Sequence, residues 1–172
     1  KTNWKDFIMF GIFLLLTTMT KPSFTFVLVP TAGLIMLYRL VKARFRNFMP
    51  SLYLGICFIP TFAALLYQFF GVFAPSGSEE GGIGFGIATA WKHHSGNILL
   101  AIGFILGFPL LVLLLNYKEL KKNILYRFSW QMMFLSLIEV LCLYEKGFRL
   151  KDMNFSWGYM HGAFFVFVTS LI

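Results

Sequence analysis

Apolar residues fall in six long runs along the chain, and short polar stretches separate them. Unbroken apolar runs of this kind are typical of helices that cross a bilayer, whereas surface helices of soluble proteins alternate apolar and polar faces. The pattern therefore predicts an all-α fold, a polytopic bundle of about six transmembrane helices. The predicted spans are residues 7–20, 24–38, 48–70, 98–116, 128–144 and 157–172.

The first two runs are short, and Lys21, Pro22 and Ser23 separate them. A proline lacks the backbone N–H group and disfavours helix at the residue before it. The two runs are therefore two spans, a broken or re-entrant pair, or one kinked helix. We expect the second helix to begin at Ser23 or Phe24, with Ser23 able to cap it.

Composition supports the membrane interpretation. Of the 172 residues, 58% are hydrophobic and 13% are charged, whereas soluble domains carry about 25% charged residues. The net charge of +8 is concentrated in clusters between apolar runs, so we expect the lipid bilayer and no nucleic acid as a partner. Cys57 and Cys142 lie inside apolar runs without a metal-binding spacing, so we expect packing residues and no metal site.

The clusters of Lys and Arg predict the orientation of the chain. They lie in the loops 39–46 and 117–127, and loops rich in Lys and Arg stay on the cytoplasmic side. The break at Lys21, the long loop 71–97 and the segment 145–156 then emerge together on the outer face. Residues 83–91 of the long loop are apolar, rich in glycine and too short to span, so we expect an interfacial segment with Trp91 at headgroup level.

Three basic residues of the outer face are candidate anion ligands. Lys21 is either a snorkelling lysine or an anion-binding group beside a helix N-terminus. His93 and His94 are adjacent, so on a helix they point about 100° apart and do not share one metal ion. They provide either contact with an anionic headgroup or phosphate, or plain polarity at the interface.

The segment 145–156 and the start of the last run carry the most varied chemistry. Glu145 and Arg149 are four residues apart and would pair if this stretch were helical. The planar fork of Arg149 suits phosphate or carboxylate, while Asn154 and Trp157 suit sugar or lipid. The alternative is a charged turn beside an aromatic belt.

Glu139 lies inside the fifth run, where an ionisable group is by default a functional hypothesis. The alternative is that Glu139 is a neutral packing residue. His161 is the candidate partner of Glu139.

Several short motifs resemble those of the C-class membrane glycosyltransferases, in particular a bacterial branch related to oligosaccharyl-, mannosyl- and aminoarabinose-transferases. The first motif is a Thr20-Lys21-Pro22 break followed by an apolar run that contains Pro30. The others are the stretch 91–97, Gly107-Phe108-Pro109 and the pattern Glu145-x-Gly147-x-Arg149 followed by Asn154-Phe155-x-Trp157-Gly158.

This resemblance implies an integral protein of the bacterial cytoplasmic membrane whose active site faces outward. It implies a polyprenyl-phosphate sugar as donor and an acceptor that the motifs do not identify. It also implies a carboxylate in the family's first outer loop that acts as base or binds a divalent metal. We expect the chain to be a piece of a longer protein and to begin after this loop. No catalytic residue is therefore assigned within the chain.

Three functions remain open at this point. The first is sugar transfer, with Lys21 and Arg149 binding the donor phosphate, Glu145 orienting Arg149, and Asn154 and Trp157 contacting sugar or lipid. The second is a transporter or lipid-flipping protein, which would show an inverted internal repeat and a polar path through both leaflets. The third is a non-catalytic membrane subunit.

Overall fold

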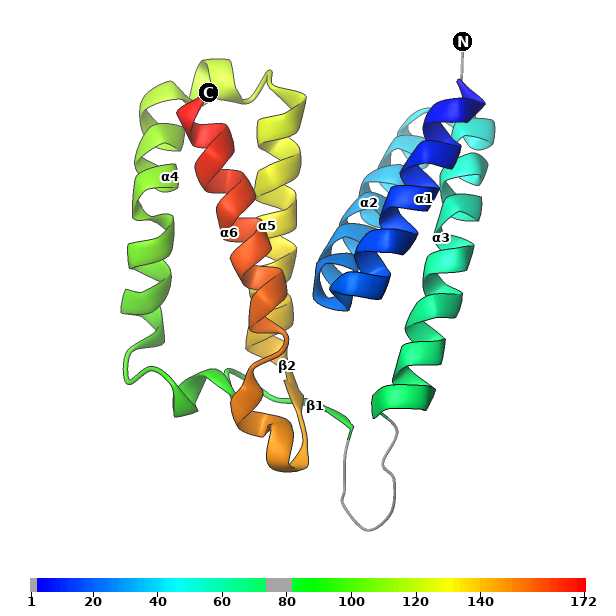
Figure 1. Ribbon diagram of the computed structural model, residues 1–172. Coiled ribbons are helices and arrows are strands. Elements are labelled where there is room, and N and C mark those ends of the chain that lie inside the picture. The colour runs from blue at the N-terminus through cyan, green and yellow to red at the C-terminus, as the bar shows by residue number, and fades with distance from the viewer. Residues whose placement is uncertain (1–2, 74–81) are drawn as a thin grey trace. The chain divides into compact units, whose positions relative to one another are not determined.

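The computed structural model describes residues 3–73 and 82–172, which form two compact units, Lys1–Ala74 and Pro75–Ile172 (Figure 1). Unit 1 contains the helices α1 (Trp4–Thr20), α2 (Pro22–Lys42) and α3 (Phe48–Gln68), and then a π-helical turn, Phe69–Phe73. Unit 2 contains β1 (Ile83–Phe85), the 3-10 turn η2 (Trp91–His93), α4 (Ile98–Leu120), α5 (Ile124–Cys142), β2 (Leu143–Glu145), the 3-10 helix η3 (Gly147–Asp152) and α6 (Ser156–Leu171). The predicted all-α helical bundle is confirmed.

In unit 1, α1 packs between α2 and α3. The ring of Phe7 lies 5.8 Å from that of Tyr53, and the Nε2 amide of Gln68 at the other end of α3 donates a 3.3 Å hydrogen bond to the carbonyl of Thr18. These two contacts show that α1 and α3 run in the same direction. The core between the three helices contains Leu14, Val29 and Phe58.

The break at Lys21 is a sharp turn between two helices, which corrects the single kinked helix among the predicted alternatives. Lys21 is the one non-helical residue between α1 and α2 (φ −147°, ψ 88°), and α2 turns back past α1 (Figure 1). The hydroxyls of Thr18 and Thr25 meet across this hairpin at 2.7 Å. The helix begins at Pro22, and Ser23 does not cap it, because Lys21 is the N-cap residue and makes no side-chain capping bond. Proline suits this first position because its missing N–H needs no partner there.

In unit 2, α5 and α6 form the most extensive helix pair, and α4 packs mainly against α6. Small residues make this approach possible: Gly158 and Gly162 of α6 are buried, and so are Ser129 and Ser136 of α5. Small side chains let helix backbones come close, which is how helices commonly pack in membranes. The core around them includes Met133 and Val166.

Two asparagines decide where the long helices of unit 2 begin. The Asn97 side chain accepts a hydrogen bond from the Leu100 N–H (3.0 Å), and the Asn123 side chain accepts from the N–H groups of Leu125 and Tyr126 (2.9 and 3.2 Å). Side-chain oxygens of this kind satisfy the free donors of a first helical turn. The fifth helix therefore begins four residues before the predicted span 128–144, and it ends earlier because residues 143–145 form a strand.

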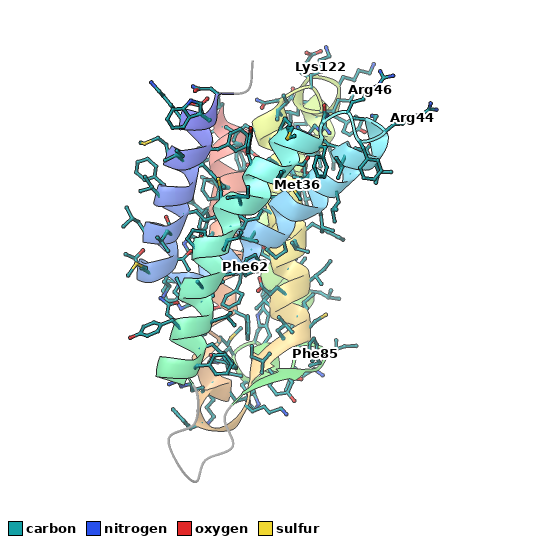
Figure 2. All side chains as sticks on the ribbon, turned by 90° about the vertical axis from the view of Figure 1, so that its right-hand side faces the viewer. Met36, Arg44, Arg46, Phe62, Phe85 and Lys122 are labelled. Atoms are coloured by element: carbon teal, nitrogen blue, oxygen red, sulfur yellow. The ribbon has the colours of Figure 1, made fainter. Side chains whose placement is uncertain are left out.

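Among the residues that the structure describes, four helices are long and apolar enough to cross a membrane: Pro22–Lys42, Phe48–Gly71, Ile98–Leu120 and Ile124–Cys142. The helices α1 and α6 have 17 and 16 residues, about 26 and 24 Å at a rise of about 1.5 Å per residue. Large apolar side chains are exposed along the helices, such as Phe62 of α3 (Figure 2) and Phe104 of α4. Contact of such apolar surfaces with lipid costs no free energy, whereas their contact with water does.

Candidate functional site

Two segments distant in sequence come together at one end of unit 2, where α5 ends and α4 and α6 begin (Figure 1). We call this region the cap and define it as residues 82–97 and 143–157. A short antiparallel ladder joins its halves, with Ile83 opposite Glu145 and Phe85 opposite Leu143. The predicted placement of the loop 71–97 and the segment 145–156 at one end is thus found for the part of unit 2 that the structure describes.

The ladder depends on two glycines that lie against one tyrosine. A Cβ atom on Gly84 would lie 2.4 Å from Cζ of Tyr144, and one on Gly86 would lie 2.4 Å from Oγ1 of Thr89 and 3.1 Å from Cε1 of Tyr144. Both distances to the nearest atom are far below van der Waals contact. The ring of Tyr144 therefore packs directly on the glycine face of the strand and holds the first half of the cap in place.

The second half of the cap folds back on itself after β2. Gly147 takes a left-handed conformation (φ 71°), and Met153 does so again after η3 (φ 48°). This path returns Asn154 to Glu145, and the Asn154 amide donates a 2.6 Å hydrogen bond to the Glu145 carboxylate. The predicted helical pairing of Glu145 with Arg149 is wrong in its premise, because Glu145 lies in a strand and η3 begins only at Gly147.

A third link joins the two halves through a histidine. The Nε2 atom of His94 lies 2.8 Å from the carbonyl oxygen of Lys151, and a carbonyl only accepts, so this nitrogen donates and carries the proton. His94 is therefore a structural link of the cap as well as a polar surface group. His93 precedes it in η2 and is exposed.

Trp91 packs inside the protein, and its depth relative to the lipid headgroups stays a prediction. It is buried, with 7% of its surface accessible, and its ring meets that of Tyr159 edge-on at 5.2 Å between centroids. The sequence indicated an interfacial segment because of its aromatic residue. The structure uses that residue to pack the cap on α6, where aromatic pairs of this geometry add to the energy of burial.

Six of the seven predicted ligand residues lie in the cap. Arg149 is half-buried in η3 with its guanidinium carbon 5.4 Å from the centre of the Phe148 ring, and Trp157 is 43% exposed at the start of α6. The others in the cap are His93, His94, Glu145 and Asn154. The seventh, Lys21, is exposed at the hairpin of unit 1.

Some candidate features lie elsewhere. The tract 74–81 lies outside the described residues. Glu139 is half-buried on α5, and Nδ1 of His161 bonds to the Trp157 carbonyl of its own helix, so the pairing of these two residues stays a prediction. Within residues 3–73 and 82–172, no group of three His, Cys, Asp or Glu side chains is placed to hold a metal ion.

Sequence reasoning missed two features that organise the cap and its helices. The alternation Ile83-Gly84-Phe85-Gly86-Ile87 has the period of two that is typical of a strand, with glycine on every second position. The sequence Gly158-x-x-x-Gly162 has the spacing that lets two helices approach closely. Both signals are present in the sequence, and both position the predicted ligands.

Comparisons with models of known protein families, with curated proteins and with solved structures find no match to this chain.

Proposed function

We propose that this chain is part of an integral membrane glycosyltransferase that binds a polyprenyl-phosphate sugar at the cap, on the extracytoplasmic face of the bacterial cytoplasmic membrane. The observation that supports it most is the joining of Arg149, Asn154 and Trp157 with two histidines in one small, internally bonded region. Two side-chain hydrogen bonds and the backbone pairing of β1 with β2 hold this region together.

The chemistry of the cap suits such a donor. Arg149 offers a planar set of N–H donors to phosphate. Lys151, two residues further on, is exposed, and so is Lys92 beside His93. When the bond between sugar and phosphate breaks, negative charge grows on the departing phosphate, and fixed cations stabilise it. The cap thus supplies donor binding, and the proposal assigns no acceptor base to the described residues.

Glu145 takes a different part from the one that its spacing suggested. Its carboxylate holds the amide group of Asn154 at 2.6 Å, which leaves the Asn154 amide oxygen as an acceptor for a sugar hydroxyl. Glu145 is therefore a positioning residue for Asn154. Trp157, three residues further on, presents a partly exposed ring, and sugar rings stack on such surfaces.

Binding of a polyprenyl phosphate to the full protein in lipid nanodiscs tests the proposal. We expect Arg149→Ala to weaken this binding at least tenfold, because one charge-assisted hydrogen bond is worth about 1.5–3 kcal/mol. Lys121→Ala is the matched control, since Lys121 lies at the other end of unit 2, after α4. Equal binding by Arg149→Ala and Lys121→Ala would overturn the proposal, and so would equal competition by phosphatidylglycerol.

The transporter alternative gains no support from the described units. It predicts an internal repeat. In unit 1 the most extensive helix pair is α1–α3, which is parallel, whereas in unit 2 it is α5–α6, which is antiparallel (Figure 1). Two copies of one repeat would share their main packing contact.

A further inference from the structure

One face of the strand at the start of the cap is apolar and exposed. Ile83 and Phe85 are 42% and 82% exposed, and Ile87 just after the strand is 83% exposed. The glycines between them face Tyr144 instead. We call these three side chains, Ile83, Phe85 and Ile87, the apolar ledge. Such a surface is costly in water and indicates a partner.

The apolar ledge is fixed at the depth of the last turn of α5. The Gly86 N–H donates to the carbonyl of Cys142 (2.9 Å), and the Ala88 N–H donates to that of Leu141 (2.6 Å). Phe85 pairs with Leu143, the first residue after the helix, and Figure 2 shows it on the strand beside that end of α5. Phe85 and Ile87 therefore lie level with the helix end.

With α5 as a membrane span, that level corresponds to the boundary of the hydrocarbon layer. The helix α5 has 19 residues, about 28 Å at a rise of about 1.5 Å per residue, which matches a hydrocarbon core of about 30 Å. Non-helical backbone is tolerated at such depth only where its polar groups are satisfied. The two bonds from Gly86 and Ala88 do this, and they also satisfy carbonyls that a helix C-terminus leaves free.

A basic residue, Lys146, follows directly beyond the apolar ledge, and a second, Lys151, lies in the same half of the cap. Lys146 continues β2 away from the helix end, its N–H bonds to the Gly82 carbonyl (2.8 Å), and its side chain is exposed. Lys151 is exposed at the end of η3. An apolar surface at the hydrocarbon boundary with cations just outside it complements the acyl chains and phosphates of a lipid leaflet.

We infer that the apolar ledge inserts into the boundary between headgroups and acyl chains, with lipid phosphates meeting Lys146 and Lys151. The cap is thereby a lipid-contacting platform held at a set depth beside α5. This inference depends on α5 spanning the membrane and not on sugar transfer, so it stands or falls separately from the proposed function.

Nitroxide labels on single cysteines test the depth. In the full protein with Cys57→Ser and Cys142→Ser, labels are placed by Phe85→Cys and Ile87→Cys, with Phe104→Cys on the exposed face of α4 as the lipid control and Asp152→Cys as the aqueous control. Phe85 and Ile87 are more than four-fifths exposed, so these changes remove little packing. The protein is reconstituted in vesicles of phosphatidylethanolamine and phosphatidylglycerol.

We expect labels at 85 and 87 to collide with oxygen more than with a water-soluble nickel chelate, with a depth between those of the two controls. The chelate should broaden only the label at 152 strongly. Labels at 85 and 87 that match the label at 152 would place the apolar ledge in water and overturn the inference. Labels shielded from both reagents would show that protein covers the apolar ledge, which would overturn it equally.

Discussion

The backbone of α6 at Gly162 touches the side chain of Ser136 on α5 so closely that no Cβ atom fits between them. A Cβ on Gly162 would lie 2.6 Å from Oγ of Ser136 and 2.9 Å from Cα of Met133. The second distance is to backbone, which does not rotate away. This contact sets the spacing of the helix pair that carries both ends of the cap's second segment.

Gly162→Ala should therefore destabilise unit 2 by about 1–3 kcal/mol, the usual cost of inserting a methyl group into a packed site. Unfolding of the purified protein by titration with sodium dodecyl sulfate measures this change. Gly103→Ala on α4 is the matched control, because a Cβ there meets nothing within 4 Å and alanine favours helix by up to about 1 kcal/mol. If the two variants were equally stable, the close approach of α5 and α6 would be wrong.

Gly84→Ala should loosen the ladder between β1 and β2, because its Cβ would collide with the ring of Tyr144 and displace it from the strand. Hydrogen exchange followed by mass spectrometry measures this as faster exchange at the amides of Gly86 and Lys146, which donate across the ladder. Removing the obstacle with Tyr144→Ala in the same chain should restore part of the protection.

Gly96→Ala serves as the control for this change within the cap, because a Cβ at Gly96 meets nothing nearby. Exchange in Gly96→Ala should match the unmodified protein. Unchanged protection in Gly84→Ala would contradict the packing of Tyr144 on the strand.

The hydroxyls of Thr18 and Thr25 should contribute unequally to the hairpin of unit 1. Thr18 donates to the Leu14 carbonyl at 2.7 Å, and a hydroxyl has one proton, so Thr25 is the donor in the 2.7 Å contact between the two. Thr18→Val then leaves the Thr25 hydroxyl without its acceptor, whereas Thr25→Val leaves Thr18 bonded to Leu14.

We expect Thr18→Val to cost about 1 kcal/mol, in the range of hydrogen bonds between membrane helices, and Thr25→Val to cost less. The same detergent titration measures both. Thr17→Val is the control, since the Thr17 hydroxyl bonds only within α1, to Phe13, in the contacts the structure describes. A larger loss of stability in Thr25→Val than in Thr18→Val would mean that Thr18, and not Thr25, is the donor.

The number and approximate position of the helices followed from the apolar runs, because a helix in lipid must be apolar nearly all round and its length is set by the bilayer. The helix boundaries did not follow as closely. Asn123 extended α5 toward its N-terminus through its capping bonds, and the pairing of Leu143 with Phe85 ended it. Helix caps depend on single residues and strand pairs depend on distant partners, and the hydrophobic pattern predicts neither.

The cap was predicted in part. The charge pattern predicted the loop 71–97 and the segment 145–156 on one side, since alternate loops of a helical bundle share a face. The hydrogen bonds that organise the cap could not be predicted from residue spacing on a helix, because residues 143–145 form a strand. Glu145 binds Asn154, nine residues away, only because left-handed turns at Gly147 and Met153 reverse the chain.

The orientation of unit 2 should place the cap outside the cell. A cysteine at Asp152 should react with an impermeant maleimide in intact cells, and one at Lys122, in the turn between α4 and α5, should react only after permeabilisation. Both residues are exposed, so access depends on the side of the membrane and not on burial. The clusters of Lys and Arg near Lys122 and between α2 and α3 (Arg44 and Arg46, Figure 2) are the basis of this expectation. The reverse labelling pattern would place the cap in the cytoplasm and remove the proposed outward site.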